Sequence, residues 1–301
     1  SDSAAPRICS EFSEPLVKAG VDYSVFTRLP DPTLAVSVND RELCIEGVVH
    51  GERYRITFRG GLPAASGEEM VRDVVINQYG RDRTPAVRFS GRAHVLPKGG
   101  PAAIPVETVN TDAVSLELFH VSDRNLLGAL RAGYVGRPLW GYEQERLSEE
   151  IATRVWQGTL ELQSVLNRDV TTRIPLAEAL RDAPTGIYAL KAVLPEADPF
   201  DDPASVQWFV LSDIGLAVLD GTDGVSVQAA SLSSAQPLPG VRLTLVSQAN
   251  AILGEVTTDA QGFGAFPAGL SRGVGASGPA LILAERGEDD IGFLSLTGPA
   301  F

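Results

Sequence analysis

The sequence has 301 residues, which is too long for one β-sandwich of about 100 residues and favours two or three such modules. It carries 25 lysines and arginines against 38 aspartates and glutamates, and the net charge of −13 argues against nucleic acid or anionic membrane surfaces as partners. Apolar residues form 44% of the chain but no run of the roughly 18 to 20 residues that span a bilayer, so we expect no direct membrane insertion.

The first predicted module covers residues 1–82. Its strands are recognised by a two-residue alternation of apolar and polar side chains, and they lie at residues 34–38, 43–47, 54–58 and 71–78. Residues 80–85 (GRDRTP) follow, with no apolar side chain and with a strand-breaking proline. Such a segment is typical of a boundary between packed units, so we place the first linker there.

The second predicted module, residues 83–204, combines strands with a helical insertion. Strands are predicted at residues 86–89, 103–110, 114–121, 171–174 and 186–193. Between about residues 122 and 162 the period changes to three or four residues, as on one face of a helix; the apolar positions are Leu126, Leu127, Leu130, Leu147, Ile151 and Val155. We therefore expect helices near 122–162, and the acidic loop 196–203 marks the second boundary.

The whole chain has only 3 tryptophans and 6 tyrosines. Four of these aromatic residues lie in the insertion: Tyr134, Trp140, Tyr142 and Trp156. These residues could form a partner-binding face. The interpretation that we favour is that they pack the helices onto the underlying sheet, because a helix on the flank of a sandwich must bury its apolar side.

The third predicted module covers residues 205–301 and begins with a strand at residues 206–212. Further strands are predicted at residues 216–219, 225–229, 241–246, 280–284 and 293–296. Turn-rich segments at 237–241 and 257–263 are typical of extracellular Ig-like modules. The complete pattern predicts an all-β protein of tandem Ig-like sandwich modules, the middle one with a helical insertion.

Cys9 and Cys44 are the only cysteines. A zinc site normally needs four clustered ligands and a redox pair needs the Cys-x-x-Cys spacing, and neither pattern is present. The remaining interpretations are a structural disulfide or two buried thiols of a cytosolic protein, of which we favour the disulfide. Closing this loop would stabilise the first module by about 3 to 4 kcal/mol.

The sequence offers no strong catalytic, cofactor or metal site. His50, His94 and His120 stand in three unrelated places, so we expect neither a catalytic triad nor a metal site. Nucleophile-elbow, phosphate-loop and zinc-peptidase motifs are missing from the sequence. Two acidic loops are weak calcium candidates whose spacing does not fit an EF-hand, and we favour solvated loops; they contain Asp198, Asp201 and Asp202, and Asp220 and Asp223. We predict a protein that is not an enzyme.

Seven strings in the sequence carry a family resemblance along the whole chain: residues 9–16 (CSEFSEPL), 41–47 (RELCIEG), 54–63 (YRITFRGGLP), 95–97 (VLP), 105–111 (PVETVNT), 121–126 (VSDRNL) and 207–216 (QWFVLSDIGL). Together they resemble the amino-terminal modules of bacterial alpha-2-macroglobulins. The resemblance implies macroglobulin-like sandwiches that form the scaffold of a larger, broad-spectrum protease trap. It also implies a periplasmic or secreted protein, in a family whose members are often anchored to the inner membrane by lipid.

The partners implied by this resemblance are the remaining modules of the parent chain and, for the full-length parent, the trapped proteases. Many members of the family hold an internal thioester in a Cys-x-Glu-Gln string. The nearest sequence here, Gly141–Gln144, contains no cysteine and cannot form that bond. An alternative function is a cell-surface adhesin or carbohydrate-binding array, which coplanar exposed aromatics on a sheet face would favour.

Overall fold

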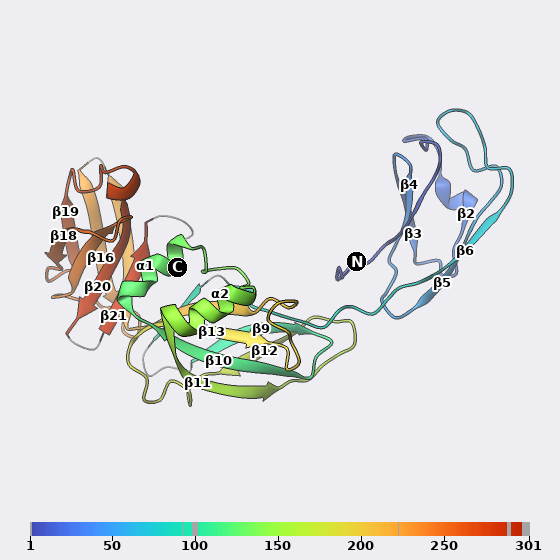
Figure 1. The fold of residues 1–301 in the computed structure, drawn as a ribbon. Helices are drawn as coiled ribbons and strands as arrows, with labels where there is room; N and C mark the ends of the chain where they lie inside the picture. Colours follow the sequence, from blue (N-terminus) through green and yellow to red (C-terminus); the bar gives the residue numbers. More distant parts are fainter. Residues whose placement is uncertain (1, 92, 98–101, 222, 288–289, 297–301) are drawn as a thin grey trace. The chain divides into compact units, whose positions relative to one another are not determined.

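The computed structural model describes residues 2–91, 93–97, 102–221, 223–287 and 290–296. Strands dominate these residues, which confirms the predicted all-β class. The chain divides into two compact units (Figure 1). The first unit comprises Ser1–Ala86, Thr108–Asn110 and Gln163–Val170, and the second comprises Val87–Glu107, Thr111–Leu162 and Thr171–Phe301.

The first unit contains two three-stranded sheets. One has the order β1-β4-β3, formed by Ile8–Glu11, Glu42–Glu46 and Ala35–Asn39. The other has the order β2-β5-β6, formed by Thr27–Arg28, Arg53–Phe58 and Val74–Tyr79, and a short 3-10 helix, Tyr23–Phe26, precedes β2. Leu43, Ile45 and Ile56 are fully buried in the core of this unit. The four strands predicted for the first module correspond to β3 to β6.

The second unit is built on a five-stranded sheet with the order β11-β10-β13-β14-β8. These strands are Ala152–Glu161, Ala113–Val121, Gly186–Val193, Ser205–Leu211 and Ala93–Leu96. A three-stranded sheet, β12-β9-β7, is formed by Val170–Pro175, Ala103–Val109 and Ala86–Arg88. All five strands predicted for this part of the chain are confirmed.

Strands β13 and β14 are buried on both faces. Tyr188 and Phe209 lie in a core shared with Ile104 and Val106 of β9, whereas Ile187 and Trp208 lie in a second core on the other face. Because successive side chains of a strand point to opposite faces, a strand covered on both sides needs an unbroken apolar run. This requirement explains the sequences of both strands.

Helices cover the second face of this sheet (Figure 1). They are α1, Asp123–Arg131, and α2, Gly141–Arg146, which continues into a π-helical turn at Leu147–Ile151. Leu126, Leu127 and Leu147 pack into the core on that face. None of the helices formed by the described residues has the length and apolarity needed to cross a membrane.

The predicted helical insertion is wrong beyond residue 151, because β11 begins at Ala152. This strand pairs with β10 along its length, and Trp156 and Leu160 pack against the core between the sheets. Val155, which fitted the helical period, is 47% exposed. Pairing with a distant strand therefore outweighs the short-range helical pattern.

Residues 206–212, predicted as the first strand of the third module, belong almost entirely to β14 and pair with β13 instead. The remaining strands form two further sheets, with the orders β15-β16-β19 and β18-β17-β20-β21. Their bounds are Ile214–Gly221, Gly224–Ser231, Arg242–Ser247, Ile252–Thr257, Phe263–Pro267, Pro279–Arg286 and Asp290–Ser295, from β15 to β21. The other predicted strands are confirmed, whereas β18 and β19 were not predicted.

Candidate functional site

The two cysteines lie directly opposite each other on the paired strands β1 and β4. Their Cα atoms are 4.0 Å apart and their sulfur atoms are joined. Antiparallel pairing thus brings together Cys9 and Cys44 from positions 35 residues apart. We propose that this pair forms a structural disulfide in the protein, which mass spectrometry of the unreduced chain tests.

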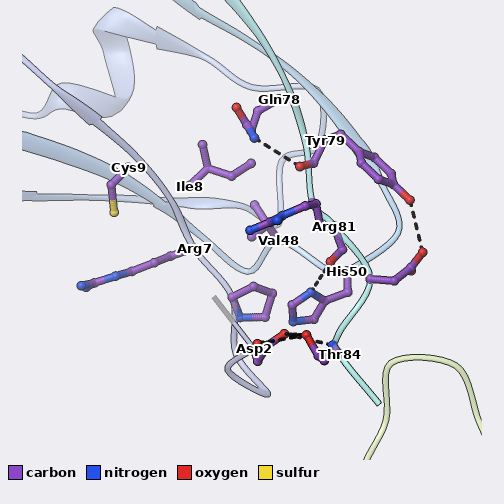
Figure 2. A pocket seen from close by; sticks show the side chains of 13 residues that line it. Asp2, Arg7, Ile8, Cys9, Val48, His50, Gln78, Tyr79, Arg81 and Thr84 are labelled. Atoms are coloured by element: carbon purple, nitrogen blue, oxygen red, sulfur yellow. Dashed lines mark hydrogen bonds between the residues drawn. The ribbon is translucent and has the colours of Figure 1, made fainter. Parts of the chain in front are cut away.

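A cleft of about 380 Å³ opens beside this pair in the first unit (Figure 2). Its lining comes from the segment that leads into β1, from β1 itself, from the loop around His50 and from the end of β6 with the residues after it. Two cations, Arg7 and Arg81, and the carboxylate of Asp2 lie among the lining residues. The lining of the cleft is therefore largely polar and charged.

The polar groups of the cleft bind mainly to one another. The Nδ1 atom of His50 lies 2.7 Å from the carbonyl oxygen of Arg81, and its Nε2 atom lies 2.8 Å from that of Ser3. The Asp2 carboxylate accepts hydrogen bonds from the backbone N–H and the hydroxyl of Thr84, at 3.0 and 3.3 Å, and the backbone bond lowers the pKa of Asp2. These contacts hold chain segments of the first unit together and occupy both ring nitrogens of His50 and the carboxylate of Asp2.

Beside the cleft, Arg83 forms a buried polar cluster within the first unit, and its side chain is only 5% exposed. Its guanidinium donates two hydrogen bonds to Asp169, at 2.9 and 3.0 Å. The backbone N–H of Arg83 donates to the side chain of Asn167, at 2.8 Å, and its carbonyl accepts from Asn110, at 2.7 Å. We call Arg83, Asn110, Asn167 and Asp169 the Arg83 clamp.

Sequence reasoning missed this clamp, because a run without apolar side chains was interpreted as an unpacked linker. Asn110 and Asn167 have positive φ angles of 48° and 61°, a backbone conformation that asparagine tolerates better than most residues. The partners come from loops 27 and more residues away in the sequence, so no local pattern identifies them.

The aromatic residues of the insertion divide into two groups, so the expectation that all four pack onto the sheet is only half correct. Tyr134 is buried in the core, and Trp156 packs against the core from β11. Trp140 and Tyr142 are instead 49% and 64% exposed. Phe200, which sequence reasoning did not select, is 71% exposed on the loop before β14. We call Trp140, Tyr142 and Phe200 the aromatic ledge.

The remaining candidate residues are the other histidines and the acidic loops. Burial lowers the pKa of His120, whose ring centre lies 5.1 Å from that of Tyr188, and the side chain of His94 lies outside the described part of the chain. The carboxylate of Asp198 accepts from the backbone N–H of Phe200, at 2.9 Å, within its own loop. In the ranges that the structure covers, no three His, Cys, Asp or Glu residues form a group suited to a metal ion.

Comparison with known proteins identifies two consecutive domains of one family. Residues 88–209 match the bacterial alpha-2-macroglobulin MG2 domain, and residues 211–301 match the bacterial alpha-2-macroglobulin MG3 domain. The alpha-2-macroglobulin of Xylella fastidiosa is 27% identical to this chain over 305 aligned residues, which cover 96% of the chain. The chain spans 18% of the length of that relative.

Solved structures show the same fold. A structure of native Escherichia coli alpha-2-macroglobulin spanning domains MG0, NIE and MG1 aligns with 98% of this chain and 93% of its own length, with a TM-score of 0.60 and 21% identity. Salmonella alpha-2-macroglobulin reacted with methylamine aligns with 99% of this chain and 18% of its own length, with a TM-score of 0.67 and 22% identity.

Proposed function

Because the chain belongs to the bacterial alpha-2-macroglobulin family, we propose that it is a structural part of a protease inhibitor, made of modules that support the trap without performing chemistry. The observation that carries this proposal is the match of two consecutive macroglobulin domain models to residues 88–209 and 211–301. The packing supports it as well, because the best-buried residues, such as Trp208, Tyr188 and Phe209, fill the two cores on the faces of the five-stranded sheet.

The module boundaries are part of the same proposal. We place the first boundary in the segment before β7, as the sequence predicts, so that the first module ends near residue 82. The second boundary was expected between residues 204 and 205, but β14 completes the five-stranded sheet. We therefore move that boundary to the turn between Leu211 and Ile214, where β15 begins a new sheet.

The proposed surroundings of the protein are the periplasm or the cell envelope, with the remaining parent modules and the trapped proteases as partners. The opposed cysteines support an oxidising compartment, because disulfides persist outside the cytosol. The adhesin alternative gains no support, since Trp140 and Tyr142 lie at the start of a helix and not on a sheet face.

A protection assay tests the proposal. Several unrelated proteases are mixed with the isolated chain or with the full-length parent, and digestion of a large protein substrate and of a small chromogenic peptide is followed. We expect the parent to protect the large substrate several-fold more than the small one, because a cage excludes by size. The isolated chain should protect neither. Protection by the isolated chain alone would overturn the scaffold role, and no protection by the parent would overturn the inhibitor function.

A further inference from the structure

The aromatic ledge brings together exposed apolar side chains from two segments of the second unit. Trp140 and Tyr142 flank Gly141 at the start of α2, and Phe200 comes from the loop that follows β13. A Cβ atom added to Gly141 would lie 3.1 Å from the ring of Phe200, so that ring lies against the backbone between the other two residues. Taking about 150 to 250 Å² for each aromatic side chain, the ledge exposes roughly 300 to 450 Å².

The backbone under the ledge is fixed by hydrogen bonds between the two segments. The N–H of Gly141 donates to the carbonyl of Pro199, at 2.8 Å. Leu139 and Ala204 exchange two backbone hydrogen bonds, at 2.9 and 2.8 Å. A partner that binds here therefore pays little for ordering the chain, which is the condition for a preformed docking surface.

Two side chains of α2 add to this support. Glu143 accepts a hydrogen bond from the backbone N–H of Trp140, at 3.1 Å, and forms an ion pair with Arg137. The amide of buried Gln144 donates to the carbonyls of Leu139 and Asp202, at 3.1 and 3.4 Å. Glu143 and Gln144, the Glu-Gln pair of the string nearest to a thioester motif, thus help to hold the backbone under the ledge in place.

The ledge has an acidic surrounding. Asp198, Asp201 and Asp202 lie on both sides of Phe200 in the loop, and Glu145 follows Tyr142 on α2. Two cations, Arg137 and Arg146, also lie nearby, and they are paired with Glu143 and Glu150. Lysine or arginine side chains on a partner would find carboxylates here and could also stack on the face of Trp140.

We propose that the aromatic ledge is the docking surface for another module of the parent chain, one that presents an apolar patch rimmed by lysine or arginine. This inference rests on the proposed function, because it takes the chain as part of a longer scaffold. The length comparison supports an occupant from the same chain, since this sequence spans 18% of its Xylella relative. Contiguous apolar surface of several hundred Å² on one piece of a larger assembly marks an interaction site.

Hydroxyl-radical footprinting of the purified full-length parent and of the isolated chain tests this proposal. Mass spectrometry gives the oxidation rates of Trp140, Tyr142 and Phe200, with buried Trp208 as the internal reference for an intact fold. We expect the rates at the ledge to be at least fivefold lower in the parent. Equal rates in the two proteins, with Trp208 protected in both, would overturn the proposal.

The variant Asp201→Lys in the parent tests the charge of the occupant, with Asp201→Asn as the matched neutral control. The side chain of Asp201 is exposed, so neither change should disturb the fold. We expect ledge oxidation to rise at least twofold in Asp201→Lys and less in Asp201→Asn; no rise would overturn a basic occupant.

Protease protection is measured on the same parent preparation. An inhibitory parent with an uncovered ledge refutes only the docking proposal, and a parent without inhibition refutes the proposed function.

Discussion

The cleft of the first unit and the aromatic ledge of the second unit are opposite kinds of surface. The cleft is concave and polar, but His50 and Asp2 already bind atoms of the same unit (Figure 2). The ledge is apolar, and its three side chains are about half to three quarters exposed. A cleft can thus be part of the internal hydrogen bonding of a domain. Exposed apolar side chains on a fixed backbone are the better candidate for binding a partner.

The largest effect on stability is expected from removing the Cys9–Cys44 pair beside the cleft. Replacing both cysteines, Cys9→Ser with Cys44→Ser, should lower the free energy of unfolding of the first unit by about 3 to 4 kcal/mol, because the closed loop no longer restricts the unfolded chain. Urea unfolding with and without reductant measures it. Reductant should lower the stability of the unsubstituted chain and leave that of the double variant unchanged. If reductant left the stability of the unsubstituted chain unchanged, the disulfide would be contradicted.

The Arg83 clamp should come next. Arg83→Met removes a buried cation and the two hydrogen bonds that its guanidinium donates to Asp169, which should cost about 3 kcal/mol, whereas the backbone bonds to Asn167 and Asn110 remain. Arg81→Met is the matched control, because that side chain is exposed at the same cleft and should cost less than about 0.5 kcal/mol. Calorimetry compares the two variants. Equal losses would show that the clamp has no special role.

A smaller effect is expected under the ledge and depends on pH. The hydrogen bond from Arg137 holds the pKa of Glu143 below its ordinary value of 4.5, so the ionised form is favoured in the folded state. The stabilisation is therefore complete above about pH 4.5 and is lost as the pH falls through the lowered pKa. Glu143→Gln should cost about 1 kcal/mol at pH 7 and less at pH 3. Urea midpoints at both pH values measure this, and a cost independent of pH would argue against the ion pair.

The smallest effect is expected at the ledge itself. Tyr142→Ser and Phe200→Ser should each change the free energy of unfolding by less than about 0.5 kcal/mol, because both side chains are mostly exposed. Thermal unfolding of the isolated chain measures the change. A loss of 2 kcal/mol or more in either variant would mean that the fold depends on the ledge, and the contrast with the cleft would fail.

The sequence predicted strands well where one or both faces are buried. Strand β13 was predicted at residues 186–193 from its local sequence, and the structure has the same bounds. Prediction failed where distant pairing decides. The helical spacing of Leu147, Ile151 and Val155 suggested that the helical insertion continues past residue 151, but β11 begins at Ala152 because β10 offers it a partner.

The surfaces were less predictable than the strands. Trp140 and Tyr142 were identified as unusual, yet the surface that they form with Phe200 depends on the close approach of Phe200 to Gly141, a contact between segments almost 60 residues apart in the sequence. The Arg83 clamp depends in the same way on Asn167 and Asp169. Local patterns describe which side chains are apolar, but only the tertiary fold decides which of them remain at the surface.

Hydrogen exchange at the backbone amides of Gly141 and Ala204 in the isolated chain tests most directly whether the ledge is preformed. Both amides donate hydrogen bonds that join the start of α2, or Leu139 just before it, to the segment carrying Phe200, at 2.8 Å in each case. A preformed ledge predicts that both exchange at least a hundredfold more slowly than an unstructured peptide, although the aromatic side chains beside them are exposed. Exchange of both amides at the unprotected rate would show a loosely held loop and would contradict a rigid docking surface.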